Sequence, residues 1–352
     1  MLQATDDLRI AGLRPLIPPA ILMEELPVTE QASVTVTDTR VQIRDCIEGR
    51  DDRLVVVVGP CSIHDPVAAL EYGGRLKEAA ARHRDALVVV MRVYFEKPRT
   101  TVGWKGLIND PHMDDSFAIN EGLRTARKLL LELGNIGLPT GSEFLDTIMP
   151  QFFADLISWG AIGARTTESQ VHRELTSGLS MPVGFKNGTG GSVQIAIDAV
   201  QAARGAHHFL SVTKQGISAI VSTSGNDSCH LILRGSSRGT NYDRQSVQDL
   251  AGALAAAGVH RRVMVDCSHG NSQKDHRLQP AVAQEVGKQL AAGSSDIFGV
   301  MLESHLVEGK QDLVKGKALM YGQSVTDACI SWEATETVLA ELAAAVERGR
   351  HV

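Results

Sequence analysis

A stretch rich in hydrogen-bond donors occupies residues 94–107 (YFEKPRTTVGWKGL), directly after an apolar run that ends near Arg92. Pro98 favours an extended backbone before it, and two glycines permit tight turns. The donors are the ammonium, guanidinium and hydroxyl groups of Lys97, Arg99, Thr100, Thr101 and Lys105. Such groups bind phosphate, although a solvated basic loop beside a strand would carry the same residue types. The stretch therefore indicates a phosphate site that needs support from the rest of the chain.

Polar residues stand at the ends of apolar runs throughout the chain. In order they are Cys61, Arg92, Glu143, Arg165, Lys186, Arg234, Asp266 with His269, and Glu303. If the runs are strands of a closed parallel barrel, all of these residues meet at one mouth. Any single cation among them could be a salt-bridged strand end. Arg92, Arg165, Lys186 and Arg234 together are costly to desolvate without anions, so the set predicts a substrate with more than one negative charge.

A second group at the same mouth could hold a metal. Cys61, His269, Glu303 and Asp327 offer one sulfur, one nitrogen and carboxylate oxygens. This mixture suits a divalent transition ion such as Mn, Fe, Co, Zn or Cu and does not suit Ca. Three further histidines near strand ends are alternative ligands: His64, His276 and His305. The sequence therefore predicts one divalent metal ion beside the cations.

The elements that must position these residues alternate between strand and helix. Eight apolar, β-branched runs predict buried strands at 54–58, 86–93, 136–143, 161–165, 182–186, 230–234, 262–267 and 296–303. Helices are expected at 66–83, 116–133, 150–159, 193–204, 245–257, 280–292 and 332–346. This order predicts an α/β fold of the (β/α)8 TIM-barrel type. A doubly wound open sheet is the alternative, weakened by the lack of GxGxxG after the first strand.

Two segments stand outside that regular pattern. Residues 208–212 and 219–223 read as an inserted β-hairpin between the fifth and sixth barrel strands. Residues 1–50 contain repeated prolines and read as an N-terminal arm, with an edge strand at 33–37 that could pair with the hairpin. We therefore expect a regulatory and oligomerisation arm at 1–50, and a catalytic barrel at 51–352 with the hairpin at about 206–224.

Composition excludes several classes of protein. The 352 residues carry a net charge of −6, and the cations are dispersed, so we expect no nucleic-acid partner. No apolar run approaches the ~20 residues that cross a membrane, and the acidic start does not resemble a signal peptide. The five cysteines form no CxxC pair, so reduced thiols are expected. These features predict a cytoplasmic protein.

Nine collinear motifs carry a family resemblance over nearly the whole chain. They are GPCSIHDP (59–66), KPRTTVGWKGL (97–107), SEFLD (142–146), AIGARTTESQ (161–170), PVGFKNGT (182–189), ILRG (232–235), DCSHGNS (266–272), ESHLVEG (303–309) and SVTDACISWE (324–333). The chain resembles the bacterial class I 3-deoxy-D-arabino-heptulosonate 7-phosphate (DAHP) synthases that an aromatic amino acid inhibits. The resemblance implies condensation of phosphoenolpyruvate with erythrose 4-phosphate, the entry step of the shikimate pathway.

The resemblance also implies roles for particular residues. The phosphoenolpyruvate site would comprise Arg92, Lys105, Ala164, Arg165, Lys186 and Arg234. The erythrose 4-phosphate site would comprise Lys97, Pro98, Arg99 and Thr100. Metal ligands would be Cys61, His269, Glu303 and Asp327, and catalytic roles would fall to Lys97, Glu143, Lys186 and His269. Glu143 is a candidate to position or deprotonate the attacking water, and Lys97 could protonate the new alkoxide.

Regulation is implied in the same way. An effector pocket between subunits would contain Asp6, Asp7, Ile10, Gln151, Leu175, Leu179, Ser180, Phe209, Ser211 and Val221. Its ligand would be phenylalanine or tyrosine, and the protein would form a homodimer or a homotetramer. Three other functions stay open: a related synthase that uses arabinose 5-phosphate, a Schiff-base aldolase through Lys186, and a phosphate-binding barrel without catalysis.

Overall fold

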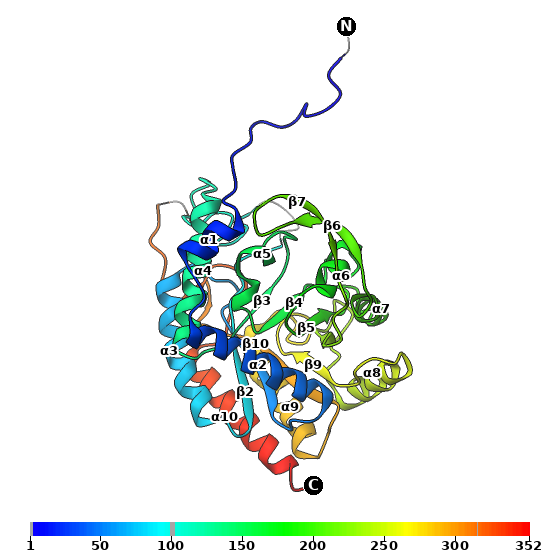
Figure 1. Cartoon of the computed structure of the whole chain (residues 1–352). Coiled ribbons are helices and arrows are strands. Elements are labelled where there is room, and N and C mark those ends of the chain that lie inside the picture. The colour runs from blue at the N-terminus through cyan, green and yellow to red at the C-terminus, as the bar shows by residue number, and fades with distance from the viewer. Residues whose placement is uncertain (1–2, 99–102, 315) are drawn as a thin grey trace.

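Eight parallel strands close into a barrel in this computed structural model, which describes residues 3–98, 103–314 and 316–352 (Figure 1). The strand order around the barrel is β1-β10-β9-β8-β5-β4-β3-β2. Their bounds are β1 (Leu54–Gly59), β2 (Leu87–Arg92), β3 (Thr140–Glu143), β4 (Trp159–Ile162), β5 (Val183–Lys186), β8 (His230–Leu233), β9 (Val263–Asp266) and β10 (Ile297–Glu303). Because β1 pairs with both β2 and β10, the sheet is closed, and the predicted TIM barrel is confirmed.

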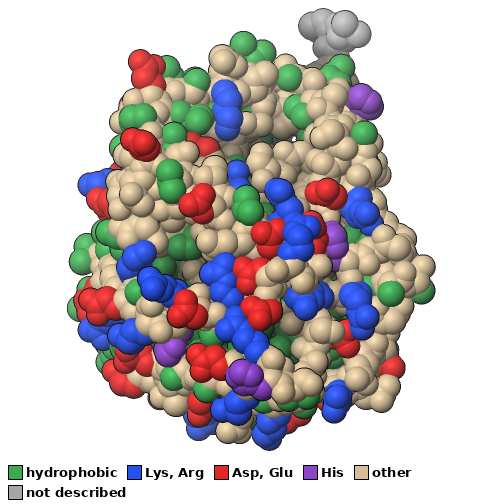
Figure 2. Space-filling model, turned by 60° about the horizontal axis from the view of Figure 1, so that its bottom comes forward, with side chains coloured by type: hydrophobic (Ala, Val, Ile, Leu, Met, Phe, Trp, Pro, Cys, Tyr) green, Lys and Arg blue, Asp and Glu red, His purple; other side chains and the backbone are tan. Residues whose placement is uncertain are grey.

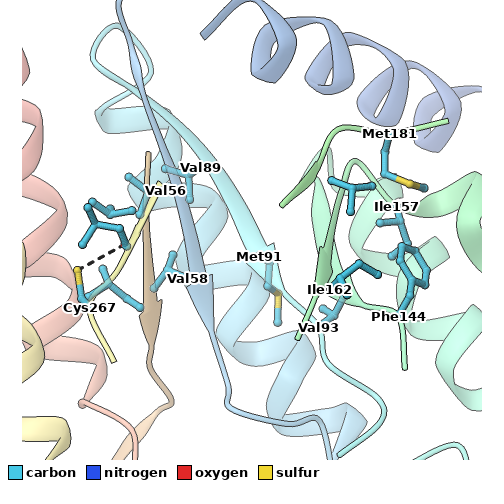
Figure 3. Close-up of a cluster of buried hydrophobic side chains, with 14 of the residues drawn as sticks. Val56, Val58, Val89, Met91, Val93, Phe144, Ile157, Ile162, Met181 and Cys267 are labelled. Carbon is cyan, nitrogen blue, oxygen red and sulfur yellow. Dashed lines mark hydrogen bonds between the residues drawn. The ribbon is translucent and has the colours of Figure 1, made fainter. Parts of the chain in front are cut away.

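Helices cover the outside of the barrel. They are α3 (Pro66–Arg82), α4 (Ile119–Asn135), α5 (Pro150–Phe153), η1 (Ala154–Leu156), α6 (Gln170–Ser177), α7 (Gln194–Ala203), α8 (Arg244–Ala256), η2 (His276–Leu278), α9 (Gln279–Ala291) and α10 (Trp332–Gly349). The start of α3 shows how the sequence sets a boundary, because Asp65 accepts hydrogen bonds from the N–H groups of Val67 and Ala68. Outward-facing strand residues form the layer under the helices, and Figure 3 shows Val56, Val58, Val89 and Met91 in it.

Side chains alternate between the two faces of each strand, and this alternation places the functional residues. Val55 and Val57 point into the barrel, as do Val88 and Val90, where they pack with Trp159. The same period of two continues past the apolar part of the strands. It brings Cys61 after Val57, Arg92 after Val90 and Glu303 after Met301 to the inner side of the carboxyl-terminal mouth.

The N-terminal region contains two helices, α1 (Pro19–Glu25) and α2 (Glu30–Glu48). Ile43, Cys46 and Ile47 of α2 belong to the same buried cluster as the inner residues of β1. Arg262, just before β9, donates a hydrogen bond to the carbonyl of Cys46 at 2.9 Å. Helix α2 therefore packs across the amino-terminal end of the barrel, opposite the mouth (Figure 1).

The predicted edge strand at 33–37 is wrong, because these residues lie within α2. Alternating Val and Thr residues suggested a strand there. Thr29 instead caps a helix by accepting the N–H of Ala32. Burial then follows helical spacing, with Ala32, Val36, Ile43 and Cys46 on the inner side. Packing against the barrel overrides the local β propensity of this segment.

Two other boundaries differ from expectation around the fourth strand. The predicted helix 150–159 stops much earlier, at Phe153 with one further 3₁₀ turn. Trp159, which was expected to end that helix, is fully buried in the barrel as the first residue of β4. The strand therefore spans Trp159–Ile162 rather than 161–165, and α6 follows it where no helix was expected. The third strand is also shorter than predicted and begins at Thr140.

The inserted hairpin is confirmed as β6 (His208–Val212) paired antiparallel with β7 (Ser218–Ser222) between β5 and β8. The N–H of Ala20, in α1, donates to the carbonyl of Lys214 at the hairpin turn. The segment before Arg14 extends away from the body of the molecule (Figure 1), whereas Arg14, Pro15 and Ile17 are hydrogen-bonded to Phe117 and Asn120. A second small sheet pairs β11 (Val307–Lys310) with β12 (Gln323–Ser324).

Acidic and basic side chains are interspersed on the face that Figure 2 shows. Neither sign of charge forms a continuous patch on that face, in keeping with the dispersed cations of the sequence. Among the described residues, no helix combines the length and the apolar composition needed to cross a membrane.

Candidate active site

A cavity of about 320 Å³ opens at the carboxyl-terminal mouth of the barrel. The structure brings together ten of the predicted site residues in its lining: Arg92, Lys97, Pro98, Glu143, Ala164, Arg165, Lys186, Arg234, His269 and Asp327. Six of them are cations or carry a ring nitrogen that can become cationic, and two are carboxylates. The mouth is therefore a strongly polar cavity with an excess of basic groups, as the strand-end pattern predicts.

One wall of the cavity is fixed by a buried carboxylate between two basic groups. Asp266 Oδ2 lies 3.0 Å from Lys186 Nζ and 2.9 Å from His269 Nδ1. Burial alone would raise the pKa of Asp266, but the His269 imidazole and the Lys186 ammonium hold that pKa well below its usual value. A carboxylate against one ring nitrogen fixes the orientation of a histidine and leaves Nε2 for a ligand.

The predicted metal ligands converge only in part. One ligand atom each of Cys61, Glu303 and Asp327 lies within 4.8 Å of the others. His269 Nε2 lies 3.9 Å from Glu303 Oε1, at the edge of this trio. His269 adopts a left-handed backbone conformation, with φ of 57°, which aims its ring from the loop after β9.

A cation lies within this trio in the form of the Lys97 ammonium. Lys97 Nζ donates to Cys61 Sγ at 2.9 Å and to Asp327 Oδ2 at 2.6 Å. Burial and the Glu303 carboxylate raise the pKa of the Cys61 thiol to about 11, so a thiolate needs a strong cation beside it. Sulfur and carboxylate donors that already surround one positive charge fit a divalent transition metal.

Arg92 is buried beneath the cavity and touches the same trio. Its Nη2 donates to Glu303 Oε1 at 3.0 Å, and both side chains are almost inaccessible, at 2% and 1% exposed. The guanidinium also lies over the ring of Tyr94, 3.4 Å from its centroid. Arg92 thus joins the cationic wall to the metal-ligand trio.

Two titratable residues of the lining, Tyr94 and Glu96, were not predicted from the sequence. Glu96 is buried and accepts hydrogen bonds from the N–H groups of Leu145 and Asp146, on the loop that follows Glu143. Burial raises the pKa of Glu96 to about 8. Tyr94 and Glu96 both continue the spacing of two from Arg92 beyond the end of β2, so the alternation could have identified them.

Some predicted substrate residues lie elsewhere. Lys105 is exposed and is not among the described residues that line the cavity, although its carbonyl accepts the N–H of Lys97 at 2.8 Å. Arg99 and Thr100 lie outside the described residues. Pro98 lies at the cavity, and its carbonyl accepts a hydrogen bond of 3.4 Å from Arg165. Arg165 thus ties the loop after β4 to the start of the basic stretch.

A second cavity, of about 890 Å³, lies beside the hairpin and α2. Its lining includes seven of the ten predicted effector residues: Gln151, Leu175, Leu179, Ser180, Phe209, Ser211 and Val221. Its three charged lining residues, Arg40, Asp155 and Lys214, were not predicted. Asp6, Asp7 and Ile10 lie instead on the projecting N-terminal segment, away from this cavity.

A parallel barrel whose mouth gathers cations beside a sulfur and carboxylate trio defines an α/β-barrel enzyme for an anionic substrate. Comparison with known proteins identifies its family. Residues 25–340 match the model of the DAHP synthetase I family. The chain therefore belongs to this family, as its motifs predict.

Individual relatives agree with this assignment. The Phe-sensitive phospho-2-dehydro-3-deoxyheptonate aldolase of Escherichia coli is 59% identical over 345 residues, which are 98% of each chain. A tyrosine-inhibited relative from Schizosaccharomyces pombe is 53% identical and covers 98% of this chain and 94% of its own. A solved structure of the Francisella tularensis phospho-2-dehydro-3-deoxyheptonate aldolase superimposes with a TM-score of 0.95 at 54% identity, covering 97% of this chain and 99% of that one.

Proposed function

We propose that this chain condenses phosphoenolpyruvate with erythrose 4-phosphate and water, and releases DAHP and inorganic phosphate. This is the first step of the shikimate pathway, which leads to the aromatic amino acids. Family membership over residues 25–340 supports the reaction. The observation that carries the proposal is the cavity itself, in which basic side chains face a space beside the trio of Cys61, Glu303 and Asp327.

Phosphoenolpyruvate would be bound by the basic side chains of the cavity. Arg165, Arg234 and Lys186 line the cavity together with Ala164, and guanidinium forks suit both phosphate and carboxylate. Burial lowers the pKa of Arg234, which still leaves a guanidinium charged at any physiological pH. These side chains hold the substrate in line with the second reactant and so lower the entropic part of the barrier.

Proton transfers fall to Lys97 and Glu143. Carbon–carbon bond formation turns the aldehyde oxygen into an alkoxide, and we assign its protonation to Lys97. Water must add at C2 of the enolpyruvate unit, and we assign its positioning to Glu143. Glu143 lines the cavity next to Gly163. A Cβ at position 163 would lie 2.6 Å from Glu143 Oε1, so only glycine leaves room for the carboxylate. Each transfer is worth roughly 10²–10⁴-fold in rate.

The metal would be held by Cys61, His269, Glu303 and Asp327. When bound, a divalent ion supplies Lewis-acid polarisation of the aldehyde. The chain's own part is to present a thiolate and two carboxylates and to fix the imidazole through Asp266. Mixed sulfur, nitrogen and oxygen donors favour Mn, Fe, Co, Zn or Cu.

A Schiff-base mechanism through Lys186 is disfavoured by the ion pair that this side chain makes with Asp266. Lys186 Nζ is buried and lies 3.0 Å from the ionised Asp266 carboxylate. A protonated amine in an ion pair cannot attack a carbonyl. The paired position instead suits a fixed positive charge that binds substrate.

We further propose that the second cavity binds an aromatic amino acid. Arg40 and Lys214 offer positive charge whose nearest partners are backbone carbonyls, those of Ala154, Ile157 and Gln151. Leu175, Leu179, Phe209 and Val221 supply an apolar surface for a ring. Phenylalanine is the preferred ligand, because a relative that is named Phe-sensitive shares 59% of the sequence.

The projecting segment with Asp6, Asp7 and Ile10 would complete this pocket on a second copy. It carries exposed Leu8, Ile10 and Leu13, which are apolar side chains that an interface between subunits would cover. This assigns residues 1–50 to regulation and assembly of a homodimer or homotetramer, in addition to the packing of α2 on the barrel.

The test is turnover with defined substrates. Purified enzyme should form DAHP from phosphoenolpyruvate and erythrose 4-phosphate, and arabinose 5-phosphate should be a poor substitute. Borohydride added with substrate should not label Lys186. Preferred use of arabinose 5-phosphate, or covalent trapping at Lys186, would overturn the proposed reaction.

A further inference from the structure

Arg92 differs from the other cations of the cavity in how its N–H groups are used. A guanidinium has five N–H donors. Nε donates to the carbonyl of Pro60 at 3.1 Å, and Nη2 donates both to the carbonyl of Cys61 at 3.1 Å and to Glu303 Oε1 at 3.0 Å. Nη1 contacts the sulfur of Met301 at 3.2 Å. One N–H therefore remains for a substrate.

Two of the four partners of Arg92, Cys61 and Glu303, are residues that would hold the metal. Arg92 stands at the end of β2, Cys61 follows β1, and Glu303 ends β10. Because β1 lies between β2 and β10, the guanidinium reaches over the end of β1 to the next strand. Gly59 makes this close approach permissible, since a Cβ there would lie 2.8 Å from the Arg92 carbonyl oxygen.

Glu303 is held from both sides. Its Oε1 accepts from Arg92, while its Oε2 accepts from Ser268 Oγ at 2.9 Å. The Arg92 side chain is itself held against the Tyr94 ring. Substitution of a residue that holds a metal ligand in place commonly weakens metal binding about 10–100-fold.

We propose that Arg92 is a positioning residue for the metal ligands Cys61 and Glu303, and that it contributes at most one hydrogen bond to phosphoenolpyruvate. The proposal rests on the metal set of the proposed function. It revises the expectation that Arg92 belongs chiefly to the substrate. Arg165 is the contrasting residue, because it is exposed at the cavity edge and makes one long hydrogen bond, of 3.4 Å, to Pro98.

The experiment measures Co²⁺ binding and phosphoenolpyruvate KM in Arg92→Lys and Arg165→Lys. Titration of metal-free protein with Co²⁺ is followed by the thiolate-to-cobalt absorption band. Arg92→Lys should raise the Co²⁺ Kd about 10–100-fold, because an ammonium cannot span Cys61 and Glu303. At saturating Co²⁺ its KM for phosphoenolpyruvate should stay within about threefold of the wild-type value.

The matched control should show the reverse split. Arg165→Lys should leave the Co²⁺ Kd unchanged and raise the KM for phosphoenolpyruvate. The inference is overturned if Arg92→Lys binds Co²⁺ like the wild type and raises that KM as Arg165→Lys does. A wild-type chain without a thiolate band, or a band that survives in Cys61→Ser, would instead defeat the metal set of the proposed function.

A measurement on the unaltered enzyme covers the case in which Arg92→Lys does not fold. In a crystal structure with Mn²⁺ and phosphoenolpyruvate, Arg92 should keep its contacts to the Cys61 carbonyl and Glu303 and direct a single N–H to the substrate. A guanidinium that has left Glu303 and binds the substrate through two N–H groups would contradict the inference.

Discussion

The barrel mouth and the second cavity hold their charges in different ways. At the mouth, buried cations meet buried carboxylates, as Arg92 meets Glu303 and Lys186 meets Asp266. In the second cavity, Arg40 and Lys214 meet backbone carbonyls, and burial lowers the pKa of both side chains. A buried ion pair fixes geometry because separating it is costly. The two cations of the second cavity are offset only by the nearby Asp155 carboxylate, which itself pairs with Arg127, so positive charge remains for a ligand.

The difference also concerns the elements that supply the residues. Strand ends of one closed barrel build the mouth, so its geometry is fixed by the sheet. The second cavity takes its lining from α2, the α5–η1 segment, the end of α6 and the two-stranded hairpin. Such peripheral elements can shift without opening the barrel. The comparison therefore contrasts a mouth held by the closed sheet with a peripheral cavity, in line with the proposed catalytic and regulatory roles.

Loss of a metal ligand at the mouth should have the largest effect. Glu303→Gln keeps the shape of the side chain but removes a carboxylate ligand and leaves Arg92 without its anion. We expect kcat/KM to fall by about 10³-fold or more and Co²⁺ affinity to fall with it. The control is Glu308→Gln, an exposed carboxylate next to His276, which should keep wild-type kinetics.

Replacement of the predicted proton donor should be nearly as severe. Lys97→Met should lower kcat about 10²–10⁴-fold while phosphoenolpyruvate still binds, as isothermal titration would measure. Lys105→Met is the matched control, because Lys105 is exposed and outside the cavity lining. Full activity of Lys97→Met would remove Lys97 from the mechanism, and a collapse of activity in Lys105→Met would restore Lys105 to the substrate site.

A substitution at Arg99 should distinguish the two ends of the substrate site by kinetics. From its sequence context we expect Arg99→Ala to raise the KM for erythrose 4-phosphate about 10–100-fold, the cost of a charged hydrogen bond. The KM for phosphoenolpyruvate should change much less. Steady-state kinetics with each substrate varied in turn measure both values, and the opposite pattern would mean that the two ends are assigned the wrong way round.

These three variants test roles that rest on the sequence. The mouth residues could be foreseen because they continue the inward period of the strands, as Val90 is followed by Arg92 and Met301 by Glu303. Glu96 keeps the same spacing from Arg92, but it lies four residues beyond the end of β2, where pairing in the sheet no longer fixes the direction of a side chain. The segment at 33–37 was missed because its helix depends on packing against the barrel, which local Val and Thr spacing does not reveal.

The second cavity should respond differently from the mouth. Leu175→Ala removes part of its apolar lining and should weaken inhibition by phenylalanine about tenfold, with kcat within about twofold of the wild-type value. Val171→Ala alters an exposed residue of the same helix and should leave inhibition unchanged. If Leu175→Ala lowers kcat and leaves inhibition intact, the two cavities are not separated as proposed.

The smallest expected effect concerns stability and pH. The Glu96 pKa is raised from 4.5 to about 8, so the folded chain holds a proton that the unfolded chain releases. Stability should therefore fall as the pH rises from 4.5 towards 8. The Gln side chain of Glu96→Gln cannot titrate. The Tm of this variant minus the Tm of the wild type should therefore be larger at pH 8 than at pH 5, by roughly a few degrees.

The control for this prediction is Glu24→Gln, which alters an exposed carboxylate of α1. Its Tm difference from the wild type should be the same at both pH values. An equal Tm difference for Glu96→Gln at the two pH values would mean that Glu96 is ionised throughout this range. It would then act as a fixed acceptor for the loop after Glu143.

The most direct test of the central claim is the release of inorganic phosphate from phosphoenolpyruvate by the purified chain. The mouth combines an anion-binding wall with a metal-ligand trio, so release should require erythrose 4-phosphate and a divalent metal together. Omission of either, or chelation of the metal, should reduce release to background. Phosphate release without the aldose phosphate, or undiminished turnover after complete metal removal, would contradict the account.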